Sequence, residues 1–257
     1  MADPLVSYQA DGHVARITLD SPHNRNALSS TLVRQLREGL SQASADADVR
    51  AVVLGHTGGT FCAGADLSEA TGGDPQEAAA GRAHELAALL RSIVECPRPV
   101  IAAVDGHVRA GGMGLVGACD IVVAGPRSTF ALTEVRIGVA PAIISLTLLP
   151  KLAPRAAARY YLTGETFNAR KAAEIGLVTI TADDVSFAVD AVTADLAKAS
   201  PQGLAASKAL TTASVLAGFD RDAERLAEDS ARLFVSEEAR EGMLSFLEKR
   251  PPRWAPR

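Results

Sequence analysis

The amino-acid sequence predicts an α/β protein whose C-terminal third is helical. Three observations lead to this fold class. Over the first two thirds of the chain, segments with the pattern of strands alternate with segments of helical spacing. From about Pro150 onwards only helical patterns follow. The chain has 257 residues, of which 47% are hydrophobic and 22% charged, so it can bury a large core.

The expected strands are short and lie in the first half of the chain. Residues 14–19 alternate apolar and polar side chains, which is typical of a half-buried strand. Three further segments contain short apolar runs that Gly, Pro or Asp bound, namely residues 51–54, 99–104 and 120–124. Such runs indicate strands of a sheet that is covered on both faces.

Apolar side chains three and four positions apart predict the helices. Residues 30–41 have this spacing, and a second helical pattern begins near Asp66. The pattern of residues 78–94 ends at Pro97 and Pro99, because proline cannot continue a helix. Beyond Pro150 we expect helices at residues 155–162, 168–175, 184–198, 202–216, 220–234 and 236–247.

Two segments that combine glycine with a strand end resemble each other. Residues 61–67 (FCAGADL) and 108–115 (VRAGGMGL) both follow an expected strand and precede a helix-compatible segment. Free N–H groups at such a corner, with the positive end of a helix dipole behind them, can bind an oxyanion. If the two corners are neighbours in a sheet, one N–H from each could meet at a single oxygen; otherwise they are two ordinary turns.

Composition excludes several classes of function. Lys and Arg number 26 against 30 Asp and Glu, and the net charge of −4 argues against nucleic acid as a partner. No apolar run approaches the roughly 20 residues of a membrane span. Cys62, Cys96 and Cys119 lie far apart without a CxxC motif, and we interpret them as buried reduced thiols of a cytoplasmic protein without a signal peptide. The five histidines lack metal-ligand spacing, so no metal is expected.

Several motifs together resemble the enoyl-CoA hydratase/isomerase (crotonase) family in order and spacing. They are residues 23–28 (HNRNAL), 61–67, 101–106 (IAAVDG), 110–112 (AGG), 118–123 (ACDIVV), 163–164 (TG) and 172–178 (AAEIGLV). The resemblance extends from about residue 6 to residue 254. It implies a crotonase (ClpP-like) ββα spiral with an acyl-CoA site over residues 1–195 and a helical trimerisation region over 196–257. It also implies a homotrimer or a dimer of trimers, with coenzyme A as part of the substrate and no separate cofactor.

The resemblance gives the two glycine corners a role. The N–H groups of Ala65 and Gly111 correspond to those that hold the thioester oxygen as it becomes an enolate. Glycine at position 111 then has a physical reason, since a Cβ there would push the carbonyl away.

Further positions of this chain match residues that contact coenzyme A in the family. Ala63, Asp66 and Leu67 would line the path of adenine and pantetheine. Phe246 and Lys249 match positions through which the C-terminal helix, often that of a neighbouring subunit, meets the CoA. Without the resemblance, Lys249 is a solvated lysine of a charged tail and Phe246 a packing residue at helical spacing.

The acidic residues depart from the family pattern. A hydratase of this family uses two glutamates to hold the water, and Glu134 falls where the second belongs, whereas the first would fall at Gly114. One buried glutamate can still take a proton from water and return one to the α-carbon if desolvation raises its pKa. Without the resemblance, Glu134 is a surface carboxylate that caps a helix or pairs with Arg136.

Three functions remain open on this basis. The first is an enoyl-CoA hydratase. The second is a Δ3,Δ2-enoyl-CoA isomerase that needs Glu134 as its sole acid and base, and the third is a non-catalytic acyl-CoA-binding homologue.

Within the family, the chain is most similar to bacterial methylglutaconyl-CoA and isohexenylglutaconyl-CoA hydratases. Arg109, Arg136 and His107 are therefore alternatives for a contact with a second substrate carboxylate. Ser145 is either a ligand of the water or bonded to local backbone.

Overall fold

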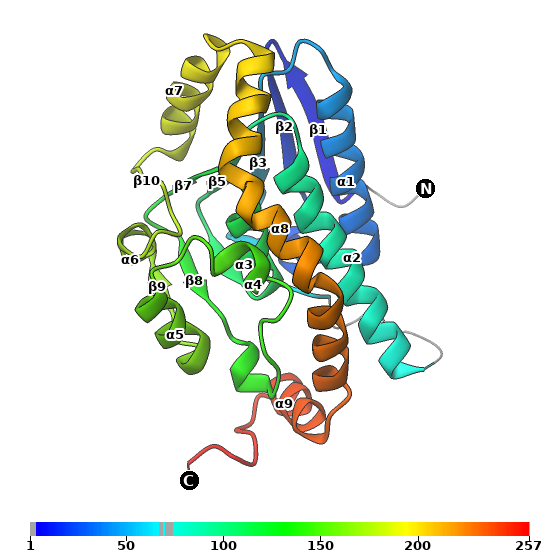
Figure 1. Cartoon of the computed structure of the whole chain (residues 1–257). Coiled ribbons are helices and arrows are strands. Elements are labelled where there is room, and N and C mark those ends of the chain that lie inside the picture. Colours follow the sequence, from blue (N-terminus) through cyan, green and yellow to red (C-terminus); the bar gives the residue numbers. More distant parts are fainter. Residues whose placement is uncertain (1–3, 67–68, 70–73, 257) are drawn as a thin grey trace.

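The strands of the protein form two sheets (Figure 1). The computed structural model describes residues 4–66, 69 and 74–256. The larger sheet has the order β1 (Val6–Asp11), β2 (Val14–Leu19), β3 (Ala51–His56), β5 (Val100–Val104), β7 (Ile121–Ala124) and β10 (Ile180–Thr181). Strand β1 is antiparallel to β2, and the other neighbours are parallel.

The smaller sheet has the order β4 (Thr60–Cys62), β6 (His107–Arg109), β8 (Thr129–Ala131) and β9 (Phe167–Asn168). Strands β4, β6 and β8 are parallel, whereas β9 runs antiparallel to β8.

Consecutive strand pairs divide between the two sheets. Each of the pairs β3–β4, β5–β6 and β7–β8 gives its first strand to the larger sheet and its second to the smaller one. The pairs are followed in turn by α2 (Pro75–Glu95), by α3 (Gly111–Ala118), and by the 3₁₀ turn η2 (Glu134–Ile137) with α4 (Ser145–Leu148). The chain therefore winds through successive ββα units, which confirms the predicted spiral.

Helices cover both faces of the larger sheet. On one face, α1 (Ser30–Ala45) and α2 pack over a core that includes Ile17, Leu54 and Leu90. On the other, α7 (Val185–Ala197) packs over a smaller cluster around Val53 and Val123. Because helices cover the central strands on both faces, neither face of these strands is exposed to water. This explains why their sequences are largely apolar.

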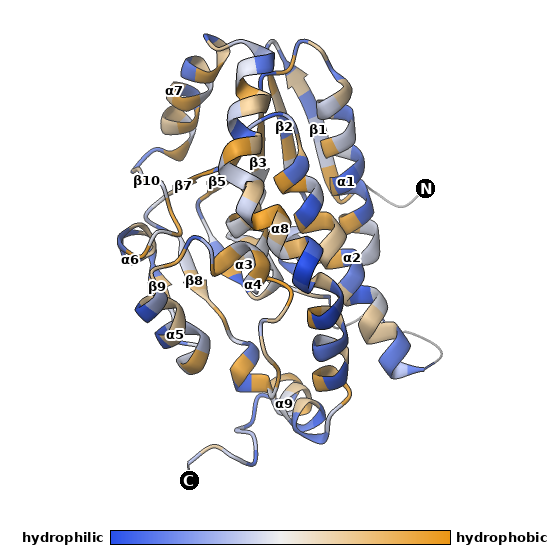
Figure 2. Cartoon of the chain, viewed as in Figure 1, coloured by the Kyte–Doolittle hydropathy of each residue, from blue (hydrophilic) through white to orange (hydrophobic). Residues whose placement is uncertain are grey.

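The C-terminal helices pack onto this core. Helix α8 (Pro201–Phe234) packs along α2. It carries both apolar and polar residues along its length (Figure 2). Helix α9 (Glu237–Leu247) lies against η2. The shorter α5 (Pro154–Thr163) and α6 (Ala169–Glu174) lie beside the smaller sheet.

The predicted break between residues 216 and 220 is wrong, because α8 is one helix of 34 residues. Gly218 lies inside it, where local propensity favours an end. Contacts with α2 continue across this point: Val215 and Phe219 are buried, and Arg91 of α2 donates to Asp220 at 2.6 Å. Tertiary packing therefore outweighs the cost of one glycine.

Other differences concern short elements. Strand β1 and the three-residue strands β4, β6 and β8 escape a periodicity analysis because they are too short or too exposed. The helix expected near Asp66 is absent at that residue, which lies in an irregular segment; residues 67 and 68 lie outside the described part of the chain. Helix α2 starts at Pro75, where Asp74 accepts a hydrogen bond from the N–H of Gln76.

The prediction for the cysteines is confirmed. Cys62, Cys96 and Cys119 are buried and carry free thiols, and burial raises the pKa of Cys62 and of Cys119 to about 12. None of the helices in the described residues has both the length and the apolar character needed to cross a membrane.

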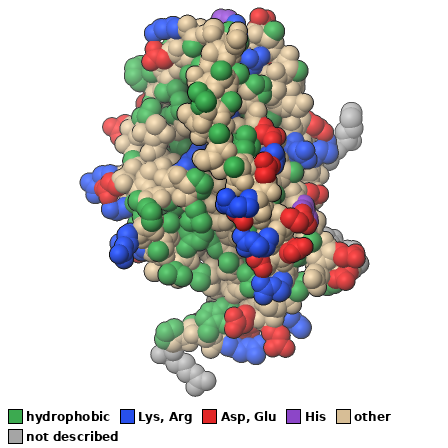
Figure 3. Space-filling view, viewed as in Figure 1, with side chains coloured by type: hydrophobic (Ala, Val, Ile, Leu, Met, Phe, Trp, Pro, Cys, Tyr) green, Lys and Arg blue, Asp and Glu red, His purple; other side chains and the backbone are tan. Residues whose placement is uncertain are grey.

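The surface separates apolar and charged areas. Green apolar side chains gather in the region of α4 and α5 in Figure 3. Leu162 of α5 is 74% exposed, and Leu149, which follows α4, is 50% exposed. Charged side chains follow the lower part of α8, where Asp222 pairs with Arg225 and Asp229 with Arg232.

Candidate active site

The two glycine corners lie side by side. Strands β4 and β6 are parallel neighbours, so the segments that follow them meet at the same edge of the smaller sheet. The contact is close, because a Cβ added to Gly64 would lie 2.7 Å from the Cβ of Ala110 and 3.3 Å from the nitrogen of Gly111. Gly64 also has a φ of 93°, which a residue with a side chain rarely adopts.

Each corner leaves one main-chain N–H without a partner among the described residues. Leu28 pairs with the first corner by donating to the carbonyl of Gly64 at 2.7 Å and accepting from the N–H of Asp66 at 3.3 Å. This pairing uses the peptides on either side of Ala65 and leaves its own N–H free. Gly111 is the first residue of α3, where an N–H has no acceptor within the helix.

The sequence predicts a helix N-terminus behind both glycine corners, and the structure shows one behind the second corner only. The N–H of Gly111 is at a helix N-terminus, as predicted. Ala65 is not, because the irregular segment after β4 continues through Asp66 and the next described helix is α2. The helix dipole therefore supports one donor of the pair within the described structure.

Both donors line a cavity of about 670 Å³ together with Glu134. Its walls come from α2, the start of α3, η2, residues 140–144, and the C-terminal helices α8 and α9. The lining is largely apolar, with Leu28, Leu86 and Ile143 among its members. An apolar cavity with few polar groups is the usual form of a small-molecule site.

Glu134 is a buried acid with an unsatisfied oxygen. Its side chain is 8% exposed, and its Oε2 has no hydrogen-bond partner among the described residues. Burial raises the pKa of Glu134 to about 7, against the opposing effect of a hydrogen bond from its own backbone N–H. Near neutral pH such a carboxyl can both take and return a proton. The alternative of a surface carboxylate paired with Arg136 is wrong, because Arg136 donates instead to the carbonyl of Thr163 at 3.4 Å.

Helix α9 helps to bury this acid. A Cβ on Gly138, the residue that ends η2, would lie 2.7 Å from the carbonyl carbon of Glu238. A Cβ on Gly242 of α9 would lie 2.4 Å from the carbonyl oxygen of Ile137. Gly138 and Gly242 thus allow the backbones of η2 and α9 to approach closely. The sequence analysis assigned no role to these two glycines.

An apolar side chain occupies the region next to Gly114. A Cβ at this position would lie 2.5 Å from Cγ2 of Ile144 and 3.1 Å from Cδ1 of Leu90. A glutamate there would have to displace both residues. Gly114 therefore does not leave an empty space where the family pattern has its first acid. The side chains of Ile144 and Leu90 fill that space instead.

The residues predicted to line the CoA path have different positions. Asp66 lines the cavity and accepts a hydrogen bond from Asn24 Nδ2 at 3.1 Å. Ala63 does not line it, and its N–H donates to the carbonyl of Arg25 at 3.1 Å. Leu67 lies outside the described residues.

Phe246 and Lys249 do not line the cavity of their own chain. Phe246 is 59% exposed, so its side chain does not pack within its own chain. Lys249 is exposed as well. Helix α9 instead presents Arg240, Met243 and Leu247 to the cavity, which sequence analysis missed.

The candidates for a contact with a second carboxylate are also placed elsewhere. Arg109 donates to the carbonyl of Thr129 at 2.7 Å, and His107 bonds to the hydroxyl of the same residue at 2.8 Å. Neither of them lines the cavity, and nor does Arg136. Ser145 donates to the carbonyl of Ala142 at 2.6 Å, which supports the local-backbone alternative.

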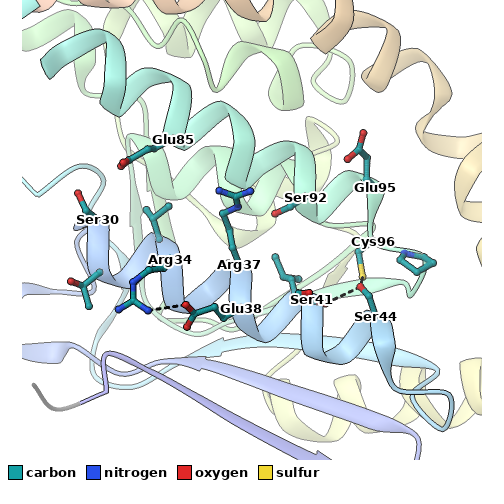
Figure 4. A pocket seen from close by; sticks show the side chains of 14 residues that line it. Ser30, Arg34, Arg37, Glu38, Ser41, Ser44, Glu85, Ser92, Glu95 and Cys96 are labelled. Atoms are coloured by element: carbon teal, nitrogen blue, oxygen red, sulfur yellow. Dashed lines mark hydrogen bonds and ion pairs between the residues drawn. The ribbon is translucent and has the colours of Figure 1, made fainter. Parts of the chain in front are cut away.

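A second cavity, of about 800 Å³, lies between α1 and α2 (Figure 4). Four of its side chains form two pairs, Arg34 with Glu38 at 2.8 Å and Ser44 with Cys96 at 3.3 Å. Although this cavity is larger, it contains neither Glu134 nor the free N–H groups of the corners. The cavity with the buried acid is therefore the candidate active site.

Two sheets wound from ββα units, with an acid-lined cavity at the strand ends, define the crotonase class of folds. Comparison with known proteins gives the family: the model of the enoyl-CoA hydratase/isomerase family matches residues 9–257. The chain therefore belongs to the enoyl-CoA hydratase/isomerase family.

Three relatives illustrate the range of similarity. The crystal structure of an enoyl-CoA hydratase from Mycobacterium avium is 68% identical, covers 98% of this chain and 100% of its own, and superposes with a TM-score of 0.93. Enoyl-CoA hydratase EchA19 of Mycobacterium tuberculosis is 31% identical over 95% of this chain and 93% of its own. Mevalonyl-coenzyme A hydratase sidH of Aspergillus fumigatus is 32% identical, with coverages of 98% and 94%.

Proposed function

We propose that this enzyme is an enoyl-CoA hydratase, which adds water across the 2,3 double bond of an enoyl-CoA thioester. The observation that carries the proposal is the meeting of a buried acid and two free N–H groups, those of Ala65 and Gly111, at one apolar cavity. The relatives from the two mycobacteria are named enoyl-CoA hydratases, which agrees with it.

In the proposed mechanism, the two N–H groups hold the thioester oxygen. The Glu134 carboxylate takes a proton from water while the water oxygen bonds to the β-carbon, and the electron pair of the double bond moves to the thioester oxygen as an enolate. The enolate then collapses as Glu134 returns the proton to the α-carbon. Hydrogen bonds to a developing oxyanion contribute about 3–4 kcal/mol per donor.

An isomerase is the second candidate, and the lone acid favours it. Moving a double bond from the 3,4 to the 2,3 position needs one base that carries a proton between two carbons and no bound water. The cavity is also lined by Asp66, Glu69 and Glu85, but the position at which the resemblance predicts the second acid is Gly114, and Ile144 fills the region next to it. A non-catalytic acyl-CoA-binding homologue is the third, and the raised pKa of Glu134 argues against it.

For the acyl group we propose a branched, carboxylated enoyl ester of the methylglutaconyl-CoA type. Arg82 of α2 and Arg240 of α9 line the cavity, and neither takes part in an ion pair with another described residue. Asp66, Glu69 and Glu85 line the same cavity, and a guanidinium that forms no ion pair with them can bind a second carboxylate of the substrate. These two arginines replace the candidates that sequence analysis named.

We also propose self-association as a homotrimer or dimer of trimers. The exposed apolar side chains of Leu149 and Leu162 support a contact with another copy. In such an assembly, Phe246 and Lys249 would reach the CoA of a neighbouring subunit. The free thiols of the chain support a location in the cytoplasm.

Assays with a small set of thioesters test the reaction. Hydration is followed with crotonyl-CoA and with methylglutaconyl-CoA, and isomerisation with a 3-enoyl-CoA. We expect hydration of at least one 2-enoyl ester and a preference for the carboxylated one. Isomerisation without any hydration would replace the hydratase by the isomerase, whereas tight binding without either reaction would leave the non-catalytic homologue.

A further inference from the structure

The candidate active site follows one face of helix α2 and ends before Leu90. The residues of α2 that line the cavity begin at Pro75 and end at Leu86, a stretch of about 16 Å along the helix axis. Leu90 lies one turn further on, is fully buried and does not line the cavity. Along α2, the cavity is therefore closed between Leu86 and Leu90.

Ile144 closes this end from the opposite side. A Cβ added to Gly114 would lie 2.5 Å from Cγ2 of Ile144 and 3.1 Å from Cδ1 of Leu90, so these two side chains meet over Gly114. Ile144 lines the cavity and is 3% exposed, and the neighbouring Ile143 also lines it and is buried. Branched apolar side chains thus form the closed end.

The closed end lies next to the donor N–H of Gly111. Gly111 and Gly114 are three residues apart in α3, which corresponds to about 4.5 Å along the helix axis. The neighbours in α2 advance by the same turn, because an added Cβ would lie 3.9 Å from Leu86 at Gly111 and 3.1 Å from Leu90 at Gly114. A thioester held at Gly111 therefore has little space beyond it in the direction of Ile144.

The other end of the cavity along α2 is open, since Pro75 is exposed and Arg82 is half-buried. The coenzyme A part of a thioester is large and carries phosphates, which need contact with water, whereas a buried apolar end suits a hydrocarbon chain. In a bound acyl-CoA, the CoA therefore occupies the open end and the acyl group points to the closed end. Of the two arginines considered for a second carboxylate, Arg82 then lies on the CoA side, which leaves Arg240 of α9.

We propose that Ile144, supported by Leu90, sets the length of the acyl group and restricts the enzyme to short chains. The inference rests on the proposed function, because it requires an acyl-CoA ester whose thioester oxygen lies at Ala65 and Gly111. Ile144 determines specificity and takes no part in proton transfer. Gly114 has a matching role, since only a residue without a Cβ gives the Ile144 side chain this space.

Binding of saturated acyl-CoA thioesters tests the proposal without turnover. Calorimetry compares butyryl-CoA with decanoyl-CoA on the wild type and on Ile144→Ala. We expect the wild type to bind decanoyl-CoA at least about tenfold more weakly than butyryl-CoA, and Ile144→Ala to abolish this preference. Ile144→Val removes one carbon and costs less stability, so it gives an intermediate result even if the alanine variant does not fold.

Leu148→Ala is the matched control. Leu148 is buried in α4, and its Cδ2 would lie 2.9 Å from a Cβ added to Gly117, one turn after Gly114 in α3. It does not line the cavity. The control loses as many carbon atoms as Ile144→Ala from the same contact between α3 and α4, so the ratio of the two affinities should change by less than about twofold.

Kinetics supplies a second readout and separates the two proposals. We expect kcat/KM for 2-decenoyl-CoA, relative to that for crotonyl-CoA, to rise at least about tenfold in Ile144→Ala. Equal binding of short and long chains by the wild type, an unchanged preference in both Ile144 variants, or the same change in Leu148→Ala refutes the role of Ile144. A wild type that binds these thioesters but hydrates none of them refutes the proposed function, while the binding comparison still decides the role of Ile144.

Discussion

The two sides of the cavity, the glycine corners and the acid on η2, contribute different kinds of groups. The corners supply main-chain N–H groups, which every residue except proline has, so their side chains matter only by being small. The acid side depends on one carboxyl, and its burial requires helix α9 on η2. Both corners that the family resemblance predicts are present, whereas one of its two predicted acids is replaced by Gly114.

The largest expected effect comes from removing the acid. Glu134→Gln keeps the size of the side chain and removes its base, so we expect kcat to fall by about a thousandfold. Affinity for butyryl-CoA, a saturated analogue, should change little because the corners remain. Calorimetry and steady-state kinetics measure the two quantities. A variant with a tenth of the wild-type kcat would show that Glu134 is not the base.

We expect the second largest effect from Gly111→Ala, which adds a methyl group at the second corner. The Cβ of Gly111→Ala would lie 2.8 Å from Cδ1 of Leu28, which also lines the cavity. We expect kcat/KM to fall by about a hundredfold, as for the loss of one oxyanion donor.

Gly218→Ala is the matched control for this variant. It adds a methyl group in α8, where a Cβ has nothing within 4 Å and the site is remote. It should keep its activity and gain up to about 1 kcal/mol in stability. Equal losses of activity in both variants would contradict the role of the corner.

The pH dependence of activity should follow the acid. Because burial raises the pKa of Glu134 to about 7, the carboxyl is protonated below this pH and cannot take a proton from water. We therefore expect kcat/KM to fall about tenfold for each pH unit below pH 7. A pH–rate profile without a limb between pH 6 and 8 would assign the base to another group.

The same carboxyl should lower stability at high pH. The folded state holds its proton up to about pH 7, whereas an unfolded glutamate loses it near its ordinary pKa of 4.5. The folded state therefore binds more protons between these values, and the free energy of unfolding falls as the pH rises through this range. The full effect is on the order of 3 kcal/mol.

Urea unfolding checks this prediction with Glu134→Gln. The variant has no charge to bury, so at pH 8 it should be more stable than the wild type by about 1–3 kcal/mol. Near pH 4 the two proteins should be similar. Equal stability at both pH values would mean that the carboxyl is solvated in the folded protein.

The smallest expected effect concerns the position of the missing acid. Gly114→Glu should not raise the rate, because its Cβ would lie 2.5 Å from Ile144. Overpacking of this kind costs about 1–3 kcal/mol. Adding Ile144→Ala in the same chain should recover part of that loss. A faster single variant would show that the wall can accept a second carboxyl without repacking.

Sequence patterns predict the parts of this molecule that depend on local order. The strands at residues 14–19 and 51–54 and the helices from Pro154 to Ala197 follow from side-chain periodicity, and two similar glycine motifs indicate the corners. The corners are neighbours because β4 and β6 are neighbours in the smaller sheet. This sheet order cannot be predicted from side-chain periodicity, since strands such as β4 are only three residues long. The break expected between residues 216 and 220 is absent because α8 packs along α2, which is far away in sequence.

The acid site is harder to predict because its properties arise from distant segments. The resemblance to the family identifies Glu134, but its raised pKa depends on burial that α9 helps to provide. Phe246 has helical spacing and is nevertheless exposed, since periodicity does not say which side of α9 faces the chain.

The close approach of Gly138 and Gly242 has a consequence for how the enzyme is made. The acid lies on a turn that is translated about a hundred residues before the helix that closes over it. A growing chain on the ribosome therefore keeps this carboxyl in water, where it has its ordinary acidity and is a weak base. Catalytic competence therefore arrives only after α9 has been synthesised.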